Sequence, residues 1–150
     1  MAIETFWEVF VNVLQDVFTW SFEDLLSKMN EDGGEGEYML WYCRLLTAGH
    51  LKVHVDKYMA FIDAVAPGMD VNAFCQSEVE PMGKECEQVQ MTALTECLTL
   101  PVRVEYLDGH DFTDKLGNVN LPNDEQPPLV TLLYRYAICC CCIIDTGERR

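Results

Sequence analysis

The stretch EQVQMTALTECLTLPVRVEYL, residues 87–107, changes from one type of secondary structure to another. Residues 87–100 are typical of a helix of about three turns. After Pro101, the apolar residues Val102, Val104 and Tyr106 alternate with charged ones, as in a half-buried strand. The chain therefore contains both helices and strands, and it passes from one to the other at this point.

Upstream of this stretch the sequence predicts helices. Residues 3–18 place apolar side chains, many of them aromatic, at helical spacing, which predicts an amphipathic helix. Ser21 can cap a short second helix, because its hydroxyl can accept a hydrogen bond from the backbone near Asp24. Further along, Asp70 can cap the helix VNAFCQSEV, which Pro81 stops.

Between these helices lies a glycine-rich acidic segment, NEDGGEGE at residues 30–37, which predicts a surface loop. A nearly all-apolar helix starts at Tyr38, and we expect it to end at Gly49 in a left-handed cap. Another helix is expected around Val53 to Val65, ahead of Pro67-Gly68.

Downstream, residues 108–128 form a long polar connection rich in turn formers, and residues 129–144, LVTLLYRYAICCCCII, are rich in strand formers. With the strand predicted after Pro101, this stretch brings the expected number of strands to two. The order of helices first and strands last predicts an α+β fold, in which a helical layer is followed by a small antiparallel sheet. At 150 residues, the chain fits a single domain, 1–150.

The chain is strongly acidic, with 25 acidic and 10 basic residues and a net charge of -15. This charge repels nucleic acid and anionic lipid, so we expect neither nucleic acid nor membrane as a partner. The acidic charge suits a partner protein with a basic patch, or it only keeps the chain soluble. The N-terminal sequence MAIETFWEVF lacks the pattern of a secretory signal. We expect a cytoplasmic location, with the nucleus as a second one.

The thiols and imidazoles show no recognisable catalytic or metal motif. We expect Cys43, Cys75, Cys86 and Cys97 to be reduced and buried as small apolar residues. His50 and His54, spaced i, i+4 on a predicted helix, could bind zinc but lack further ligands, which favours a surface or packed pair. His110 lies in a polar loop. We therefore predict no catalytic residue, no cofactor-binding residue and no metal site.

Four consecutive cysteines, Cys139 to Cys142, lie near the C-terminus. In a strand they would point alternately to opposite faces, so they could not converge on one tetrahedral zinc ion. Lipidation would need a second membrane signal. The remaining interpretation is that they extend the final strand as small apolar residues, with any exposed thiol open to oxidation.

Four blocks of the sequence form a recognisable pattern: LLTAGHLKVHVDKYMAFI, VNAFCQSEVEPMGKECEQVQMTAL, LPVRVEYLD and PLVTLLYR. In this order they resemble the otubain branch of the OTU deubiquitinases, and FCQSEVEPMGKE is the best single marker. The resemblance covers about residues 4–135, the C-terminal half to two-thirds of an otubain domain, and leaves 136–150 as a divergent tail. It implies a truncated papain-like cysteine peptidase fold, recognition of ubiquitin and, as the family's activity, hydrolysis of ubiquitin isopeptide links by a cysteine.

The motifs that carry catalysis in this family are not found in the sequence. The family's nucleophile lies in a DGNCF-like motif upstream of the matched blocks, and its histidine lies in a PGHYD-like motif directly after LLYR. Here Arg135 is followed by Tyr136-Ala137-Ile138-Cys139. A DHxH-like pattern of otubains is replaced by Glu87-Gln88-Val89-Gln90. A thiol protease needs both its thiolate and its imidazole.

The resemblance therefore implies an otubain-like protein of the ubiquitin system that is inactive by itself. Its expected partners are ubiquitin or polyubiquitin, and a ubiquitin-conjugating enzyme. Two alternatives remain open. One is an active thiol deubiquitinase that uses a non-standard cysteine, and the other is a truncated gene product without function.

Overall fold

The computed structural model describes residues 3–106, 117–123, 126–135 and 138–144. The contacts within the chain group into two compact units, Met1–Lys84 and Glu85–Arg150, and each is described by itself. The expectation of one partial otubain-like domain over 1–150 stays a prediction.

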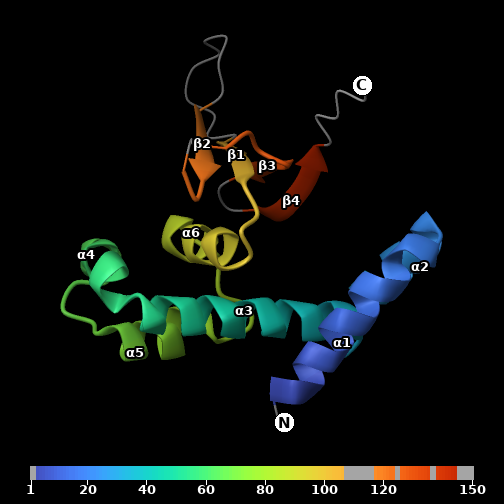
Figure 1. Ribbon diagram of the computed structural model, residues 1–150, viewed down its shortest axis with the longest axis horizontal. Helices are drawn as coiled ribbons and strands as arrows, with labels where there is room; N and C mark the ends of the chain where they lie inside the picture. The colour runs from blue at the N-terminus through green and yellow to red at the C-terminus, as the bar shows by residue number, and fades with distance from the viewer. Residues whose placement is uncertain (1–2, 107–116, 124–125, 136–137, 145–150) are drawn as a thin grey trace. The chain divides into compact units, whose positions relative to one another are not determined.

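The first unit is helical (Figure 1). Its elements are α1 (Ile3–Asp16), η1 (Val17–Thr19), α2 (Phe22–Asn30), α3 (Glu35–Val53), α4 (Val55–Val65), α5 (Val71–Phe74) and η2 (Cys75–Val79). In the described part of the chain, no helix combines the length and the apolar character that crossing a membrane requires.

The helix α1 packs against α3 through aromatic rings. The Phe6 ring lies 5.6 Å from that of Tyr38 and 6.2 Å from that of Trp41, measured between centroids. On the next turn the Phe10 ring lies 4.9 Å from that of Tyr42. Ring pairs at these distances add to the stabilisation from burial. The expected aromatic face of the first helix is thus confirmed, although the α-helix ends at Asp16 and a 3₁₀ turn follows.

Both helix caps expected from the sequence are present. The Ser21 hydroxyl accepts a hydrogen bond from the backbone N–H of Asp24 at 3.1 Å, and the Asp24 carboxylate accepts one from the backbone N–H of Ser21 at 3.2 Å. These hydrogen bonds lower the pKa of Asp24. At the start of α5 the Asp70 carboxylate accepts from the backbone N–H of Ala73 at 2.9 Å. Each cap satisfies a donor that the helix leaves unpaired.

The helix α3 is longer than the sequence indicated at both ends. It starts at Glu35, inside the expected loop 30–37, and it continues through Gly49 to Val53. The expected C-terminal cap at Gly49 is therefore wrong. A glycine inside a helix costs about 1 kcal/mol, but continuing the helix buries the Leu51 side chain completely, and this burial offsets that cost.

The core of the first unit lies between α3 and the segments that follow it. The residues with almost no exposed surface are Ala48, Leu51, Tyr58, Ile62, Phe74, Cys75 and Val79. Among them, the end of α5 and the π-helical turn η2 contribute the last three. The marker sequence FCQSEVEPMGKE thus begins as part of this core.

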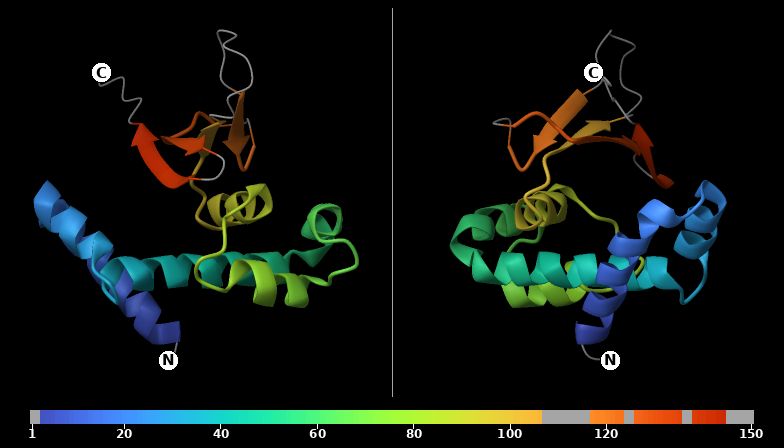
Figure 2. Two further views of the ribbon diagram at one scale, coloured as in Figure 1. Left: turned by 180° about the vertical axis from the view of Figure 1, so that it is seen from behind. Right: turned by 45° about the vertical axis from the view of Figure 1, so that its right-hand side comes forward.

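The second unit consists of one helix and a four-stranded sheet (Figure 2). Its elements are α6 (Gln88–Cys97), β1 (Val102–Tyr106), β2 (Gly117–Leu121), β3 (Val130–Arg135) and β4 (Ile138–Ile144). The strand order is β2-β1-β3-β4. The expected passage from helix to strand at residues 87–107 is confirmed, and helices precede strands throughout the described residues.

The sheet is mixed, which corrects the expectation of an antiparallel sheet. β1 pairs antiparallel with β2 and parallel with β3, while β3 and β4 are antiparallel. The predicted polar connection contains β2, which occupies one edge of β1. The chain then returns to the start of β1, where the backbone N–H of Leu129 donates to the Pro101 carbonyl at 2.9 Å. β3 must therefore run parallel to β1.

The core of the second unit lies on one face of this sheet. Val102, Val104 and Leu121 are buried, and Met91 of α6 packs against them together with partly buried strand residues. The alternation seen in the sequence of β1 matches this burial, since Val102 and Val104 face the helix side. α6 thus covers the strands that the adjoining sequence forms.

Candidate functional site at the ends of the parallel strands

The parallel pairing of β1 and β3 brings their C-terminal ends together. Tyr106 pairs with Tyr134 in the register, and their rings meet edge to face at 5.5 Å and 66°. Burial raises the pKa of the Tyr106 phenol. The resemblance implies that a catalytic histidine would follow β3, so these two tyrosines mark the place on the sheet that it would occupy.

The chain after β3 forms another strand. Residues 136–137 lie outside the described residues, and Ile138–Ile144 then form β4. Leu133 of β3 is in register with Cys142, and Arg135 with Ile138. Cys139 to Cys142 thus lie within a strand, as expected, but in a separate strand that turns back along β3. A five-residue PGHYD-like motif directly after LLYR would end at residue 140, so its last three positions fall on the start of β4.

The four other cysteines differ in exposure. Cys75 is fully buried, and its thiol donates to the Ala48 carbonyl at 3.7 Å between sulfur and oxygen. Cys43 and Cys97 are half-buried and Cys86 is exposed, so the expectation of burial holds in full for Cys75 alone of these four and is wrong for Cys86. Cys86 lies in the segment between η2 and α6.

Burial makes two of these thiols poor nucleophiles. It raises the pKa of Cys75 to about 11 and also raises the pKa of Cys43. At neutral pH a thiol with a pKa of about 11 is ionised in roughly one molecule in ten thousand, and the thiolate is the reactive form. Neither residue suits the alternative of a non-standard catalytic cysteine.

The two histidines pack against each other. The rings of His50 and His54 lie 4.4 Å apart, and the His50 ring also meets that of Tyr58 at 5.9 Å. His54 is not on the same helix, because it separates α3 from α4. Within the described residues no group of three or more His, Cys, Asp or Glu side chains could hold a metal ion. His110 lies outside the described residues.

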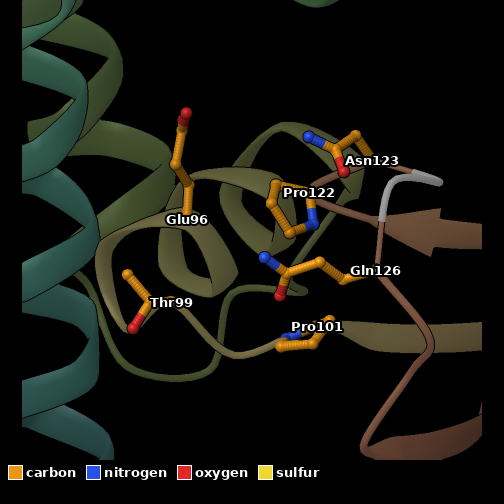
Figure 3. A pocket seen from close by; sticks show the side chains of 6 residues that line it. All are labelled: Glu96, Thr99, Pro101, Pro122, Asn123 and Gln126. Atoms are coloured by element: carbon orange, nitrogen blue, oxygen red, sulfur yellow. The ribbon is translucent and has the colours of Figure 1, made fainter.

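A pocket of about 170 Å³ lies at the opposite end of the strands (Figure 3). It is lined by Glu96, Thr99, Pro101, Pro122, Asn123 and Gln126. Glu96 lies in the last turn of α6 and Thr99 just beyond that helix. Pro101 precedes β1, Pro122 and Asn123 follow β2, and Gln126 lies between β2 and β3. These groups can exchange hydrogen bonds with a polar ligand, but they offer no thiol and no imidazole.

A residue that sequence reasoning missed holds the family marker segment. Arg44 of α3 donates to the Val79 carbonyl at 2.8 Å and to the Lys84 carbonyl at 2.5 Å. Its Nε is buried and has no hydrogen-bond partner among the described residues. A single charged residue within the apolar run YMLWYCRLL could have signalled this role, because a buried charge needs partners.

Ion pairs support the same segment. Lys52 of α3 reaches the Glu80 carboxylate at 2.8 Å, and Lys84 reaches that of Glu78 at 3.1 Å. Both pairs are partly exposed, so each contributes little to stability. Together with Arg44, these pairs join α3 to the residues that follow it within the first unit.

Comparison with known proteins identifies the family. The model of the family Peptidase C65 Otubain matches residues 1–137. Human ubiquitin thioesterase OTUB1 is 36% identical over 136 residues, which cover 89% of this chain and 48% of the relative. The OVARIAN TUMOR DOMAIN-containing deubiquitinating enzyme 1 of Arabidopsis thaliana is 31% identical over 152 residues. The match covers 89% of this chain and 49% of the relative's length.

A solved structure agrees with these relatives. The h/ceOTUB1 chain in a complex with ubiquitin aldehyde and UBCH5B~Ub matches with a TM-score of 0.77 and 30% identity, over 89% of this chain and 51% of that one. The expected otubain fold is therefore confirmed, and the chain spans about half the length of the relatives that it matches. The 150-residue chain belongs to the otubain family of peptidases.

Proposed function

We propose that these 150 residues bind ubiquitin, or a ubiquitin-charged conjugating enzyme, and do not hydrolyse ubiquitin linkages by themselves. The observation that carries the proposal is the chain after β3. There the sequence Tyr136-Ala137-Ile138-Cys139 leads into β4, where the family resemblance implies a histidine. Without an imidazole at that place, a thiol has no general base.

The relatives support the binding part of the proposal. Solved structures of OTUB1 chains contain ubiquitin aldehyde together with UBCH5B~Ub or UBC13~Ub. The marker segment, which includes η2, is held by hydrogen bonds from Arg44 and contains residues of two ion pairs. A cytoplasmic location goes with this role and stays a prediction.

A binding experiment tests the proposal directly. Isothermal titration calorimetry would measure the affinity of the chain for ubiquitin and for ubiquitin-charged UBCH5B, with human OTUB1 as the positive control. We expect saturable binding of at least one of the two. A chain that unfolds cooperatively, and is therefore folded, yet binds neither ligand would contradict the proposal.

A second experiment tests the absence of catalysis. Diubiquitin would be incubated with the chain, and in parallel with human OTUB1, and a ubiquitin active-site probe would be added to each. We expect that the 150-residue chain cleaves no diubiquitin and that the probe labels none of its cysteines. Labelling of one cysteine in the chain would favour the alternative of a non-standard nucleophile. If the chain neither unfolds cooperatively nor binds either ligand, the result would favour the alternative of a truncated gene product without function.

A further inference from the structure

The pocket at the end of α6 is lined by oxygen atoms from several parts of the second unit. We call it the α6 pocket, and its lining residues are Glu96, Thr99, Pro101, Pro122, Asn123 and Gln126. Glu96 supplies a carboxylate, and Asn123 and Gln126 each supply an amide oxygen. The Gln126 side chain points towards the end of α6, where Glu96 and Thr99 lie (Figure 3). These acceptors therefore line one cavity of about 170 Å³.

Several hydrogen-bond donors of this lining are already used or missing. The Thr99 hydroxyl donates to the Leu98 carbonyl at 2.7 Å, so its oxygen meets a further group as an acceptor. The Thr99 backbone N–H donates to the Glu96 carbonyl at 3.1 Å. Pro101 and Pro122 have no backbone N–H. Among the six lining side chains, the two amides carry the other donors, so the pocket suits a ligand that is rich in donors.

Charge favours a cation in the α6 pocket. Glu96 lies in the last turn of α6, where the helix dipole also places partial negative charge. That turn contains no basic residue, and none of the described residues that line the pocket is basic. The chain has 25 acidic and 10 basic residues, so its overall field attracts cations as well. An anionic ligand would be repelled by all three sources of charge.

Among the cations that proteins carry, the guanidinium group fits this lining best. It offers five N–H donors in one plane, whereas the lysine ammonium offers three. Two parallel donors can bind one carboxylate, as in the usual arginine–carboxylate pair, and the others remain for the amide oxygens. The flat faces of guanidinium are weakly hydrated and pack on rings, which Pro101 and Pro122 supply.

The size of the α6 pocket is sufficient for this group. A single water molecule needs about 10–15 Å³ of a cavity. A cavity of about 170 Å³ therefore holds the four heavy atoms of a guanidinium group together with part of its aliphatic stem. The lining described above has no cation that would bind the α-carboxylate of a free amino acid, which favours an arginine within a polypeptide.

We propose that the α6 pocket binds the guanidinium group of an arginine side chain presented by a partner protein. The Glu96 carboxylate accepts two hydrogen bonds from it, and Asn123 and Gln126 accept further ones. The pocket lies at the end of the strands opposite to Tyr106 and Tyr134, so this site is separate from the place after β3. The proposal goes beyond the proposed ubiquitin binding and does not depend on it.

Titration followed by NMR tests the proposal. The ¹⁵N-labelled 150-residue chain would be titrated with N-acetyl-arginine amide, and in parallel with the corresponding citrulline and lysine compounds and with free arginine. We expect saturable shift changes centred on the backbone amides of Thr99, Asn123 and Gln126. The citrulline compound has nearly the same shape without the charge, so it should bind roughly tenfold more weakly or less. The lysine compound and free arginine should also bind more weakly than the blocked arginine.

Matched variants locate the site. Glu96→Gln should weaken the binding of N-acetyl-arginine amide by roughly tenfold or more, because the ligand loses a hydrogen-bonded charge. Glu85→Gln removes the same charge from an exposed position of the same unit, and it should leave the affinity unchanged. Circular dichroism would show that both variants fold. If Glu96→Gln unfolds, Gln126→Ala, outside the helices and strands, should weaken binding in the same direction.

Four results would overturn the proposal. A folded chain that does not bind N-acetyl-arginine amide, or equal binding of the citrulline compound, would exclude a guanidinium site. Unchanged affinity in folded Glu96→Gln would place the binding elsewhere. Tighter binding of free arginine than of the blocked compound would assign the pocket to a small molecule.

Calorimetry with ubiquitin separates this proposal from the proposed function. Glu96→Gln should leave the affinity for ubiquitin unchanged while it weakens binding of the arginine compound. An equal loss of both would make the α6 pocket part of a ubiquitin-binding surface and would overturn a separate partner. If the chain binds the arginine compound but not ubiquitin, the proposed function fails and the guanidinium site stands.

Discussion

Thr99, the residue after the C-cap Leu98 of α6, adopts a left-handed backbone conformation with φ of 52°. Two hydrogen bonds close the helix end around it: its N–H donates to the Glu96 carbonyl at 3.1 Å, and the N–H of Leu100 donates to the Thr95 carbonyl at 2.9 Å. This is the Schellman arrangement, in which glycine is usual at the left-handed position. A β-branched residue is strained there.

Thr99→Gly should therefore stabilise the protein by about 1 kcal/mol, because glycine adopts this conformation without a steric penalty. The free energy of unfolding in urea would measure the change. Thr92→Gly, in the interior of the same helix, is the matched control and should destabilise by a similar amount. Destabilisation by Thr99→Gly would show that the threonine side chain contributes more than the strain costs.

Cys75 links stability to alkaline pH. Its pKa is raised to about 11 in the folded protein by burial, whereas the ordinary value is 9.0. The folded state thus holds the proton more tightly. The stabilising contribution is complete below pH 9 and is lost as the pH rises towards about 11.

Unfolding in urea from pH 8 to pH 11 would test this linkage. In the unmodified protein the free energy of unfolding should fall more steeply with pH than in Cys75→Ala, by roughly 2–3 kcal/mol in total. The exposed Cys86 supplies the control, since Cys86→Ala should keep the steep dependence. Equal slopes for the unmodified protein and Cys75→Ala would contradict the linkage.

At the scale of elements, the connection between α2 and α3 depends on a close approach of backbones. Gly36, in the first turn of α3, faces Met29 near the end of α2. A Cβ atom on Gly36 would collide with the Met29 carbonyl oxygen and come within 2.9 Å of its carbonyl carbon and Cα. These are backbone atoms, so they cannot move aside without displacing the helix.

Gly36→Ala should consequently destabilise the protein by about 1–3 kcal/mol, as overpacking does elsewhere. Gly49→Ala is the matched control in the same helix. A Cβ atom there meets nothing within 4 Å, so alanine should stabilise by up to about 1 kcal/mol. The melting temperatures of the two variants should shift in opposite directions. A higher melting temperature for Gly36→Ala would show that α2 can move to accommodate the added methyl group.

At the scale of the whole molecule, the net charge of -15 opposes folding through self-repulsion. Salt screens this repulsion, so the melting temperature should rise by about 2–4 °C between low and moderate NaCl concentration, equivalent to roughly 1 kcal/mol. A variant with Glu8→Gln, Glu31→Gln and Glu85→Gln reduces the charge to -12 (-15 + 3). Its response should be smaller, and an equal response would assign the effect to something other than net charge.

Local chemistry accounts for the parts of the fold that could be predicted. The caps at Ser21 and Asp70 and the alternation in Val102–Tyr106 depend on neighbours a few residues away, and the structure has all of them. The end of α3 was predicted wrongly, because the burial of Leu51 outweighs the helix-breaking tendency of Gly49. Such burial depends on residues far along the chain.

The candidate site could likewise be predicted from the sequence only in part. The residues after β3 could be identified from the sequence alone, because LLYR is followed by other residues than the family's histidine motif. The two carbonyls bound by Arg44, and the parallel register of Tyr106 with Tyr134, could not. Each joins segments at least 28 residues apart, counted as 134 - 106 for the tyrosines.

The sequence by itself determined where helices give way to strands, how two helices begin, and that the stretch after β3 departs from the family. The tertiary structure alone decided that β2 lies within the polar connection, that the sheet is mixed, and that one side of α1 is left exposed. The physical reason is the distance along the chain over which each kind of interaction acts. Caps and side-chain periodicity act within a turn or a strand. Strand order and burial depend on which segments, far apart in the sequence, pack against each other and exclude water.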